Sequence, residues 1–382
     1  MCGAAGRPVP SGPSGYSHVA GQVTGGWAAT LVAVDYVALF PAGAASLVAE
    51  GVRSLLPDAR VGESDDSALS FSTRVRLDSA DAVPIARNLF LVRRRVARRD
   101  LNATVADLTS RVTDLPRPPG CTGFRLMFHV DGQLVAGSPR ARQALGEAIS
   151  AATGLKAQPR GRCQEYWVIG RRDWSAMYFA ERLPAGKTHL PVDKGSLSAE
   201  LSALLVSLSR PDPEDVFLDP FAGSGSIVAA RLATPARKVI FNDRDTSLYR
   251  AAMARLGHQP GLAYSHEDGT AMTSVRSADV SAIVTDPPWG EYDESVGNYA
   301  QFTRSMAAEF SRMLNPRAGR LVLLVSRRHA ERLRESLAGS GFSCEPPIGI
   351  LVNGHPAAVI RGYPSAVLSV PPHQEDRGQG QD

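Results

Sequence analysis

A strand that runs into a glycine-rich turn and then into a helix is the feature that most limits the fold of this chain. Residues 215–219 read Asp-Val-Phe-Leu-Asp, residues 220–226 read Pro-Phe-Ala-Gly-Ser-Gly-Ser, and a helical pattern starts at Ile227. Glycines allow a tight turn and close approach of the backbone to a ligand, and a helix start presents free N–H groups. The turn lacks the third glycine of a dinucleotide fingerprint and the Gly-Lys-Ser/Thr of a phosphate loop. Alone, it is a weak signal for an α/β fold that binds a ligand.

Two acidic residues follow this turn at regular places. Residues 238–243 read Lys-Val-Ile-Phe-Asn-Asp, which predicts a second strand that ends in Asp243. The distance from Gly225 to Asp243 matches the place where nucleotide-binding α/β folds hold ribose hydroxyls with a carboxylate. Asp268 lies in a further acidic loop, before an apolar strand at 281–285. Either acid alone is as typical of a solvated loop as of a site, but the ordered series favours a site.

The strand at 281–285 ends in the run Asp286-Pro287-Pro288-Trp289. Proline has no N–H donor and a fixed φ, so the Asp286 carboxylate and the backbone carbonyls stay free as acceptors. The ring of Trp289 offers a flat face on which a flat substrate stacks. These groups suit the exocyclic amine of a nucleobase. The alternative interpretation is a proline-rich turn after a core strand.

Together these motifs resemble those of the Rossmann-like S-adenosylmethionine-dependent methyltransferases of amino groups. The resemblance covers residues 190–365 and implies S-adenosyl-L-methionine as the cofactor. It places a methionine-binding loop at Asp219, Pro220, Phe221, Gly223 and Gly225, the ribose-binding acid at Asp243, and Asp268 near the adenine amine. It makes Asp286, Pro287, Pro288 and Trp289 the catalytic run. Within this class, the paired motifs are most similar to the RNA guanine-N2 methyltransferases that carry a THUMP domain, which usually have Tyr where this chain has Trp289.

Composition excludes several other classes of protein. The chain has 382 residues, 43% hydrophobic and 21% charged, which is typical of a globular protein of two or three domains. It has no apolar run of the length that spans a membrane. The four cysteines are scattered and the eight histidines do not cluster. We therefore expect no disulfide framework, no metal site, and a reducing, cytoplasmic location.

The net charge is only +4, but the cations are clustered. One cluster contains Arg87, Arg93, Arg94, Arg95, Arg98 and Arg99, and a second contains Lys156, Arg160, Arg162, Arg171 and Arg172. Such clusters neutralise phosphates, so we expect the N-terminal half to hold nucleic acid, and the family resemblance makes this RNA, specifically tRNA. A solvated helix face is the alternative for either cluster, and it is the favoured interpretation of a third set, Arg327, Arg328, Arg332 and Arg334.

The sequence predicts a Rossmann-like α/β domain that follows a smaller α+β region. The expected parts are a disordered leader (1–26), a ferredoxin-like region (27–115), a THUMP-like RNA-binding domain (116–184), a linker (185–196), a methyltransferase domain with a seven-stranded mixed sheet (197–365) and a disordered tail (366–382). Pro-Arg-Pro-Pro at 116–119 marks the boundary inside the N-terminal half. The ferredoxin-like and THUMP assignments rest on resemblance, which also implies a grip on the acceptor end of tRNA.

Hydrophobic periodicity places the individual elements. In the N-terminal half, strands are expected at 28–40, 68–75, 123–130, 164–169 and 174–180, helices at 44–56, 105–112 and after the N-cap Ser138, and either a helix or a strand at 82–97. The helix at 44–56 should bury Leu47, Val48, Val52 and Leu55. In the C-terminal half, helices are expected at 197–208, 227–233 and 299–314, a strand at 320–326, and a closing antiparallel pair at 342–352 and 357–363.

The expected activity is methyl transfer to the N2 amine of a guanosine in tRNA. Asp286 and the Pro287 carbonyl would accept the amine hydrogens, Asp286 or a water would take the proton, and Trp289 would stack on the extruded base. Glu291 and Asp293 are further candidates for contact with the base edge. The alternatives are an adenine-N6 methyltransferase of DNA or RNA, a non-catalytic RNA-binding protein, and a methyltransferase of small molecules or protein glutamine. The sequence leaves open the modified nucleotide, mono- or dimethylation, the oligomeric state and any partner subunit.

Overall fold

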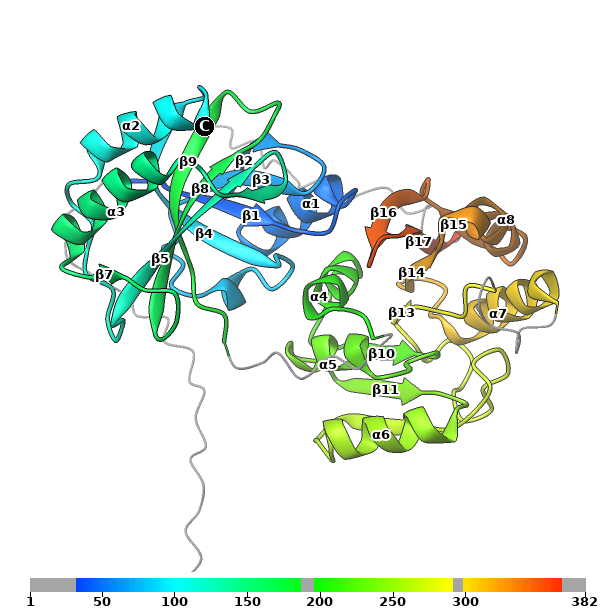
Figure 1. Ribbon diagram of the computed structural model, residues 1–382. Helices are drawn as coiled ribbons and strands as arrows, with labels where there is room; N and C mark the ends of the chain where they lie inside the picture. The colour runs from blue at the N-terminus through cyan, green and yellow to red at the C-terminus, as the bar shows by residue number, and fades with distance from the viewer. Residues whose placement is uncertain (1–31, 187–195, 291–297, 366–382) are drawn as a thin grey trace, which may run out of the picture. The chain divides into compact units, whose positions relative to one another are not determined.

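The computed structural model describes residues 32–186, 196–290 and 298–365. The expected leader and tail lie outside these ranges, as do most of the expected linker and the candidates Glu291 and Asp293. The described strands form two sheets, one in each half of the chain (Figure 1). Each half is described by itself.

The N-terminal half builds one nine-stranded sheet with the order β2-β3-β1-β4-β9-β8-β5-β6 and β7 beside β5. Its strands are β1 (Val34–Leu39), β2 (Arg60–Ser64), β3 (Ala68–Thr73), β4 (Asn88–Ala97), β5 (Gly123–Val130), β6 (Gln133–Val135), β7 (Lys156–Ala157), β8 (Cys163–Gly170) and β9 (Ala176–Arg182). Its helices are α1 (Ala45–Leu55), the short η1 (Ala80–Ala82), α2 (Leu101–Arg111) and α3 (Pro139–Thr153). The two regions expected at 27–115 and 116–184 therefore share a sheet, because β4 pairs with β9.

Side-chain alternation gives this sheet two different faces. On β9, Met177 and Phe179 belong to the core under α2 and α3, whereas Tyr178 and Ala180 point to the other side. On that side, the hairpin of β2 and β3 contacts the turn between β8 and β9. Glu63 accepts hydrogen bonds there from the Ser175 amide at 2.5 Å and from the Tyr178 hydroxyl at 2.6 Å.

The C-terminal half builds an eight-stranded mixed sheet with the order β12-β11-β10-β13-β14-β17-β15 and β16 beside β17. The prediction of seven strands is therefore wrong, because the segment expected as one strand at 342–352 forms both β15 and β16. Its strands are β10 (Val216–Asp219), β11 (Lys238–Asn242), β12 (Leu262–Ser265), β13 (Ala282–Thr285), β14 (Arg320–Ser326), β15 (Phe342–Cys344), β16 (Ile348–Val352) and β17 (His355–Pro364). Its helices are α4 (Ala199–Leu208), α5 (Ser226–Leu232), α6 (Thr246–Leu256), α7 (Tyr299–Met313), the short η3 (Arg327–His329) and α8 (Ala330–Gly339). Strands β12, β11, β10, β13 and β14 are parallel to one another, and β17 is antiparallel to β14.

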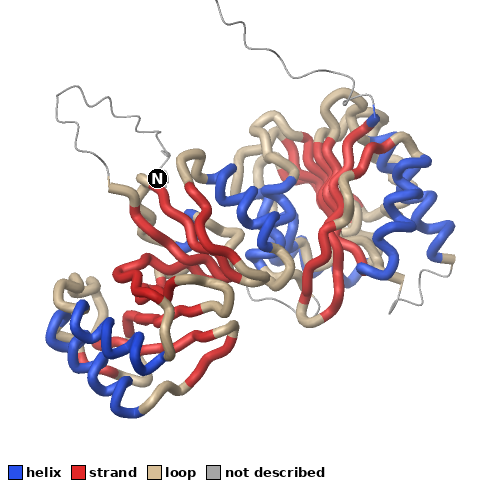
Figure 2. The backbone as a smooth tube through the Cα atoms, turned by 90° about the horizontal axis from the view of Figure 1, so that it is seen from above, coloured by secondary structure: helices blue, strands red, loops and turns tan. Residues whose placement is uncertain are grey.

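Helices cover both faces of this second sheet (Figure 2). Side chains of α4, α5 and α6 pack with Phe217 and Phe241 on one face, and those of α7 and α8 pack with Leu218 and Ile283 on the other. The strands are therefore buried on both sides, which explains why β10, β13 and β14 read as continuous apolar runs in the sequence.

Most expected elements are present, with informative corrections. Leu55 is 39% exposed and the following Leu56 is buried instead, because α1 ends at Leu55 and the chain turns inward there. The segment 342–352 is two strands, since Pro346 and Pro347 have no N–H donors for a ladder. The segment at 82–97 is strand β4 from Asn88 onward, and β1 starts only at Val34. Strands β2, β6, β7 and β12 and helix α6 were not predicted. Ser138 caps α3 as predicted, accepting a hydrogen bond from the Ala141 amide at 3.2 Å.

Candidate active site

The topology brings three acidic residues to one edge of the C-terminal sheet. Strand β10 pairs in parallel with β11 on one side and with β13 on the other. Asp219 ends β10, Asp243 follows β11 and Asp286 follows β13. Carboxyl ends of parallel strands meet at one edge, and a crevice opens where the chain crosses to opposite sides of a strand. The first and the last of these residues are 67 positions apart in sequence. All three are nevertheless neighbours in the sheet, at the point where the strand order reverses.

The glycine-rich turn after β10 adopts a conformation that requires its glycines. Gly223 and Gly225 have φ values of +51° and +75°, in the left-handed region that other residues rarely adopt. A Cβ added at Gly223 would meet no heavy atom within 4 Å, so the turn has open space beside it. The turn is pinned from the next strand, because the Gly223 amide donates to Asp243 Oδ2 at 2.7 Å.

Asp219 is buried, and one of its oxygens lacks a partner. Its Oδ1 accepts a long hydrogen bond from the Phe221 amide at 3.3 Å, while Oδ2 and the neighbouring Thr285 hydroxyl have no hydrogen bond of ordinary geometry. Burial raises the pKa of Asp219 to about 8; the Thr285 hydroxyl and the Phe221 amide oppose this shift, and Asp243 and Asp286 add to it. A buried acceptor of this kind is costly unless a donor reaches it.

Asp243 and Asp268 are each engaged in holding their loops. Asp243 Oδ1 accepts from the Asp245 amide at 2.8 Å, in addition to the bond from Gly223. Asp268 Oδ1 accepts from the Thr270 amide at 2.8 Å, and Asp268 Oδ2 lies 3.8 Å from Arg244. A carboxylate offers about four lone-pair positions, so both acids keep capacity for a ligand.

Phe221 contributes to packing, and Pro220 anchors the loop. The Phe221 ring lies 5.7 Å from that of Phe302 and 6.4 Å from that of Phe310 on α7. The Pro220 carbonyl accepts a hydrogen bond from Asn242 Nδ2 at 2.9 Å. These two residues therefore set the position of the turn from both sides.

Asn242 is an organising residue that the sequence analysis missed. Its buried side chain also donates to the Glu267 carbonyl at 3.1 Å and accepts from the Glu267 amide at 3.0 Å. It thus ties the loops after β10 and β12 to the end of β11. Although burial opposes the shift, hydrogen bonds from Ser265, Ser274 and Thr273 lower the pKa of Glu267 to about 2. One signal in the sequence could have identified Asn242: it is a polar residue at the last position of an otherwise apolar strand.

Trp289 contacts the acid that it follows. Its indole Nε1 donates to Asp286 Oδ1 at 2.7 Å. Among the described residues, Oδ2 of Asp286 has no hydrogen-bond partner. Burial of the carboxyl raises the pKa of Asp286 to about 7, and the hydrogen bond from Trp289 opposes the shift. The Trp289 ring is partly buried against the core, and in this conformation its indole N–H orients the Asp286 carboxylate.

The expected phosphate contacts of the N-terminal half fall into three groups. Arg171 is 3% exposed and lies 3.6 Å from Asp65, so its expected role as a surface contact is wrong. Arg93, Arg94, Arg95 and Arg98 each pair with an acid: Glu181, Asp114, Glu63 and Asp131. Exposed positions without an acidic partner among the described residues remain at Arg99, Lys156, Arg160, Arg162 and Arg172.

The exposed cations do not form one patch. Strands β5 and β8 are parallel, and their registers begin at Gly123–Cys163 and end at Val130–Gly170. Lys156, Arg160 and Arg162 precede the start of β8, whereas Arg172 follows its end. At about 3.3 Å per residue, the two groups lie roughly 25 Å apart along the sheet.

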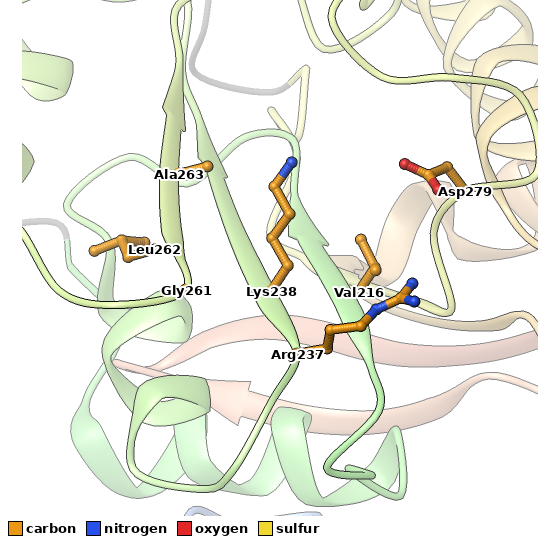
Figure 3. Close-up of a pocket in the computed structure, with 7 residues that line it drawn as sticks. All are labelled: Val216, Arg237, Lys238, Gly261, Leu262, Ala263 and Asp279. Atoms are coloured by element: carbon orange, nitrogen blue, oxygen red, sulfur yellow. The ribbon is translucent and has the colours of Figure 1, made fainter.

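A pocket of about 520 Å³ lies elsewhere on the second sheet (Figure 3). It is lined by Arg237, Lys238, Gly261 and Asp279, at the amino ends of the strands. This is the edge opposite to Asp219 and Asp286, so the pocket is separate from the candidate site. Among the described residues, no group of His, Cys, Asp or Glu could hold a metal ion, and no helix is long and apolar enough to cross a membrane.

Comparison with known proteins identifies the C-terminal half. Residues 190–256 and 253–339 match the family described as UPF0020, RMKL-like, methyltransferase domain. This region is a methyltransferase domain. The sequence motifs imply S-adenosyl-L-methionine as its cofactor. A comparison with curated proteins found no match.

Three solved structures share the fold of nearly the whole chain. TrmN from Thermus thermophilus aligns with a TM-score of 0.67 at 21% identity, over 87% of this chain and 99% of its own. A protein from Listeria monocytogenes, whose title calls it a predicted N6-adenine-specific DNA methylase, aligns with a TM-score of 0.59 at 17% identity, over 87% of this chain and 97% of its own. SMU.472, described as a putative methyltransferase complexed with SAH, aligns with a TM-score of 0.56 at 12% identity, over 87% of this chain and 98% of its own. The N-terminal half is thus part of the shared architecture.

The residues at the sheet edge fit this cofactor. The unpartnered Asp219 Oδ2 suits an ammonium donor, and the open space at Gly223 leaves room for a ligand against the backbone. Asp243 adjoins the same turn through its bond to the Gly223 amide. The fit rests on an orphaned buried acceptor and on glycine geometry, independently of the family match.

Proposed function

We propose that the protein methylates the exocyclic N2 amine of a guanosine in tRNA. The observation that carries the proposal is the position of Asp286, held by Trp289 at the carboxyl end of β13, next to the Asp219 loop on β10. An acceptor fixed beside a methyl-donor pocket is what an amine with two N–H groups needs. The two halves of the chain then divide the work: the N-terminal half holds RNA and the C-terminal half carries the reaction.

The residues of the chain would act mainly by positioning. Asp219, Gly223 and Gly225 would hold the methionine part of the cofactor, Asp243 its ribose, and Asp268 would lie near its adenine. The bound cofactor supplies a methyl group already activated by a sulfonium. Asp286 would accept one N–H of the amine through Oδ2, and the Pro287 carbonyl would accept the other. Alignment of this kind is a large part of the rate gain in a displacement reaction.

The proton balance follows from the same geometry. Methyl transfer would leave the amine nitrogen with a positive charge and one surplus proton. Asp286, or a water beyond it, then takes the surplus proton. Asp286 must be ionised to act, and the indole N–H of Trp289 favours that form.

An adenine-N6 methyltransferase is the second candidate. Adenine carries the same kind of amine, and one structural neighbour has a title that names N6-adenine specificity on DNA. The exposed cations of the N-terminal half fit either nucleic acid through its phosphates.

Radiolabelled methyl transfer to unmodified tRNA, followed by nucleoside mass analysis, tests the proposal. N2-methylguanosine that disappears in Asp286→Asn would support it, since the amide keeps the shape and loses the charge. Methyladenosine in RNA or DNA would favour the second candidate. Label in protein alone would contradict both.

A further inference from the structure

Arg327 and Arg328 lie at the same sheet edge as the candidate catalytic residue. Strand β14 runs parallel to β13, with Thr285 opposite Leu323. Asp286 is therefore level with Leu324, and Arg327 follows three residues further on, directly after β14 ends. At about 3.3 Å per residue, this places the arginines about 10 Å beyond Asp286 in the strand direction.

Ring contacts connect this short helix to the catalytic run. A side chain at Gly290, the residue after Trp289, would overlap the ring of Tyr299. The Tyr299 ring in turn lies 4.5 Å from that of His329, the last residue of η3. The Ser326 hydroxyl accepts from the Arg328 amide at 3.3 Å and fixes the start of η3. The arginines are thus carried by a segment that is linked to the residue after the catalytic run through the Tyr299 ring.

The charges of the two arginines are not neutralised within the described residues. Both are exposed and have no acidic partner there, whereas Arg334 on α8 pairs with Glu331 at 2.8 Å. The Arg327 guanidinium also lies against Gly349: a Cβ at that glycine would be 3.3 Å from its Cζ and 3.4 Å from its Nε. Packing against a backbone without a side chain restrains the guanidinium, so less rotamer entropy is lost when it binds a ligand.

We propose that Arg327 and Arg328 bind phosphates of the RNA strand that flank the target nucleotide. This inference rests on the proposed function and adds a second RNA-binding surface, on the methyltransferase domain itself. Guanidinium groups pair with phosphate oxygens through two parallel hydrogen bonds. Held at this distance, the strand would be fixed while its extruded base lies at Asp286.

The experiment compares Arg327→Ala/Arg328→Ala with Arg317→Ala. Arg317 is also exposed and has no acidic partner among the described residues, but it precedes β14 at the opposite edge of the sheet. For each variant, tRNA affinity is measured by fluorescence anisotropy across a range of KCl concentrations, S-adenosyl-L-methionine affinity by calorimetry, and thermal stability by scanning fluorimetry.

The double variant should lose about tenfold or more in tRNA affinity, and the slope of log affinity against log salt should fall by about 1.4, which corresponds to two phosphates of a single strand. Cofactor affinity and Tm should match the wild type, KM for tRNA should rise and kcat at saturation should change little. Arg317→Ala should behave as wild type. Arg327→Lys/Arg328→Lys should keep most of the salt slope.

Unchanged tRNA affinity in the double variant would overturn this inference and leave the proposed function standing, provided that the wild type forms N2-methylguanosine in tRNA. An equal loss in Arg317→Ala would also overturn it, because the effect would then be one of overall charge. If the wild type neither binds nor methylates tRNA, the proposed function and this inference fail together.

Discussion

The indole Nε1 of Trp289 donates a hydrogen bond of 2.7 Å to Oδ1 of Asp286. This bond joins the first and last residues of the Asp-Pro-Pro-Trp run, so the run closes on itself as a small ring of contacts. It gives the aromatic residue a role that ring stacking alone does not require, because Phe could stack equally well and could not donate.

Trp289→Phe should therefore impair catalysis although it keeps an aromatic face. Loss of a hydrogen bond to a charged group costs about 1.5–3 kcal/mol, so we expect kcat/KM to fall about 10- to 100-fold. The acid limb of its pH profile should also move to higher pH, since the lost bond opposes the rise in the pKa of Asp286. Steady-state kinetics from pH 5.5 to 9 check both effects. If Trp289→Phe lowers activity but leaves the acid limb of the pH profile unchanged, the hydrogen bond to Asp286 has no part in catalysis and only ring stacking remains as the role of Trp289.

The wild-type enzyme should gain activity with rising pH. Burial raises the pKa of Asp286 to about 7, and only the ionised carboxylate can take up the proton that the amine loses. We expect kcat/KM to rise through a midpoint near pH 7 and to reach a plateau above about pH 8. Asp286→Asn should have little residual activity and no such midpoint. A flat wild-type profile would exclude Asp286 as the titrating group.

Asp219→Asn should weaken cofactor binding and yet stabilise the free protein at high pH. The folded-state pKa of Asp219 is raised to about 8 from an ordinary value near 3.8. The folded state then binds a proton that the unfolded state releases, so stability is lost as pH rises from the unfolded pKa towards the folded one. The asparagine has no proton to lose. Its Tm should match the wild type only near pH 4 and should exceed it by several degrees at pH 9.

Calorimetry with S-adenosyl-L-methionine supplies the second readout for Asp219→Asn. The neutral amide cannot neutralise an ammonium, so affinity should fall at least about tenfold. A Tm difference that is independent of pH would show that burial does not raise the pKa of the Asp219 carboxyl.

Asn242→Ala tests the residue that ties three loops together. Its side chain makes three hydrogen bonds at a buried position, and its removal leaves the Glu267 amide and two carbonyls without these partners. We expect a loss of about 2–4 kcal/mol in the free energy of unfolding, measured with urea, and weaker cofactor binding. Asn315→Ala is the matched control: Asn315 accepts from Arg317 and Ala318 amides at the opposite edge of the sheet, so cofactor affinity should not change. Equal cofactor loss in both variants would contradict a local role.

The C-terminal half could be read from sequence because its signals are local. Apolar runs, glycines at positive φ and acids at strand ends are written in consecutive residues, and parallel pairing then gathers Asp219, Asp243 and Asp286 without further information. Asn242 escaped notice because a single buried polar residue gains its meaning only from partners 22 to 25 positions away.

The N-terminal half was harder because its decisive contacts are distant in sequence. The pairing of β4 with β9 joins segments that Pro-Arg-Pro-Pro at 116–119 had suggested as separate. The hairpin strand β2 gave no clear pattern, since its residues alternate between exposed and half-buried positions at a sheet edge. Charge clustering likewise could not distinguish Arg171 from Arg172, although one is buried and the other is exposed.

These adjacent arginines provide the last prediction. Arg171 pairs with Asp65 at 3.6 Å in the interior, where loss of one partner leaves a charge unpaired. Arg171→Ala should therefore lower the free energy of unfolding by about 3 kcal/mol. Asp65→Asn should destabilise in the same direction without removing any cation. Arg172→Ala should leave stability unchanged and weaken tRNA binding, with a smaller salt slope. Binding is measured at 10 °C, after thermal scans have shown that each variant is folded at that temperature. If Asp65→Asn instead strengthened tRNA binding at that temperature, the freed Arg171 would be reaching phosphate, and its buried, structural role would be wrong.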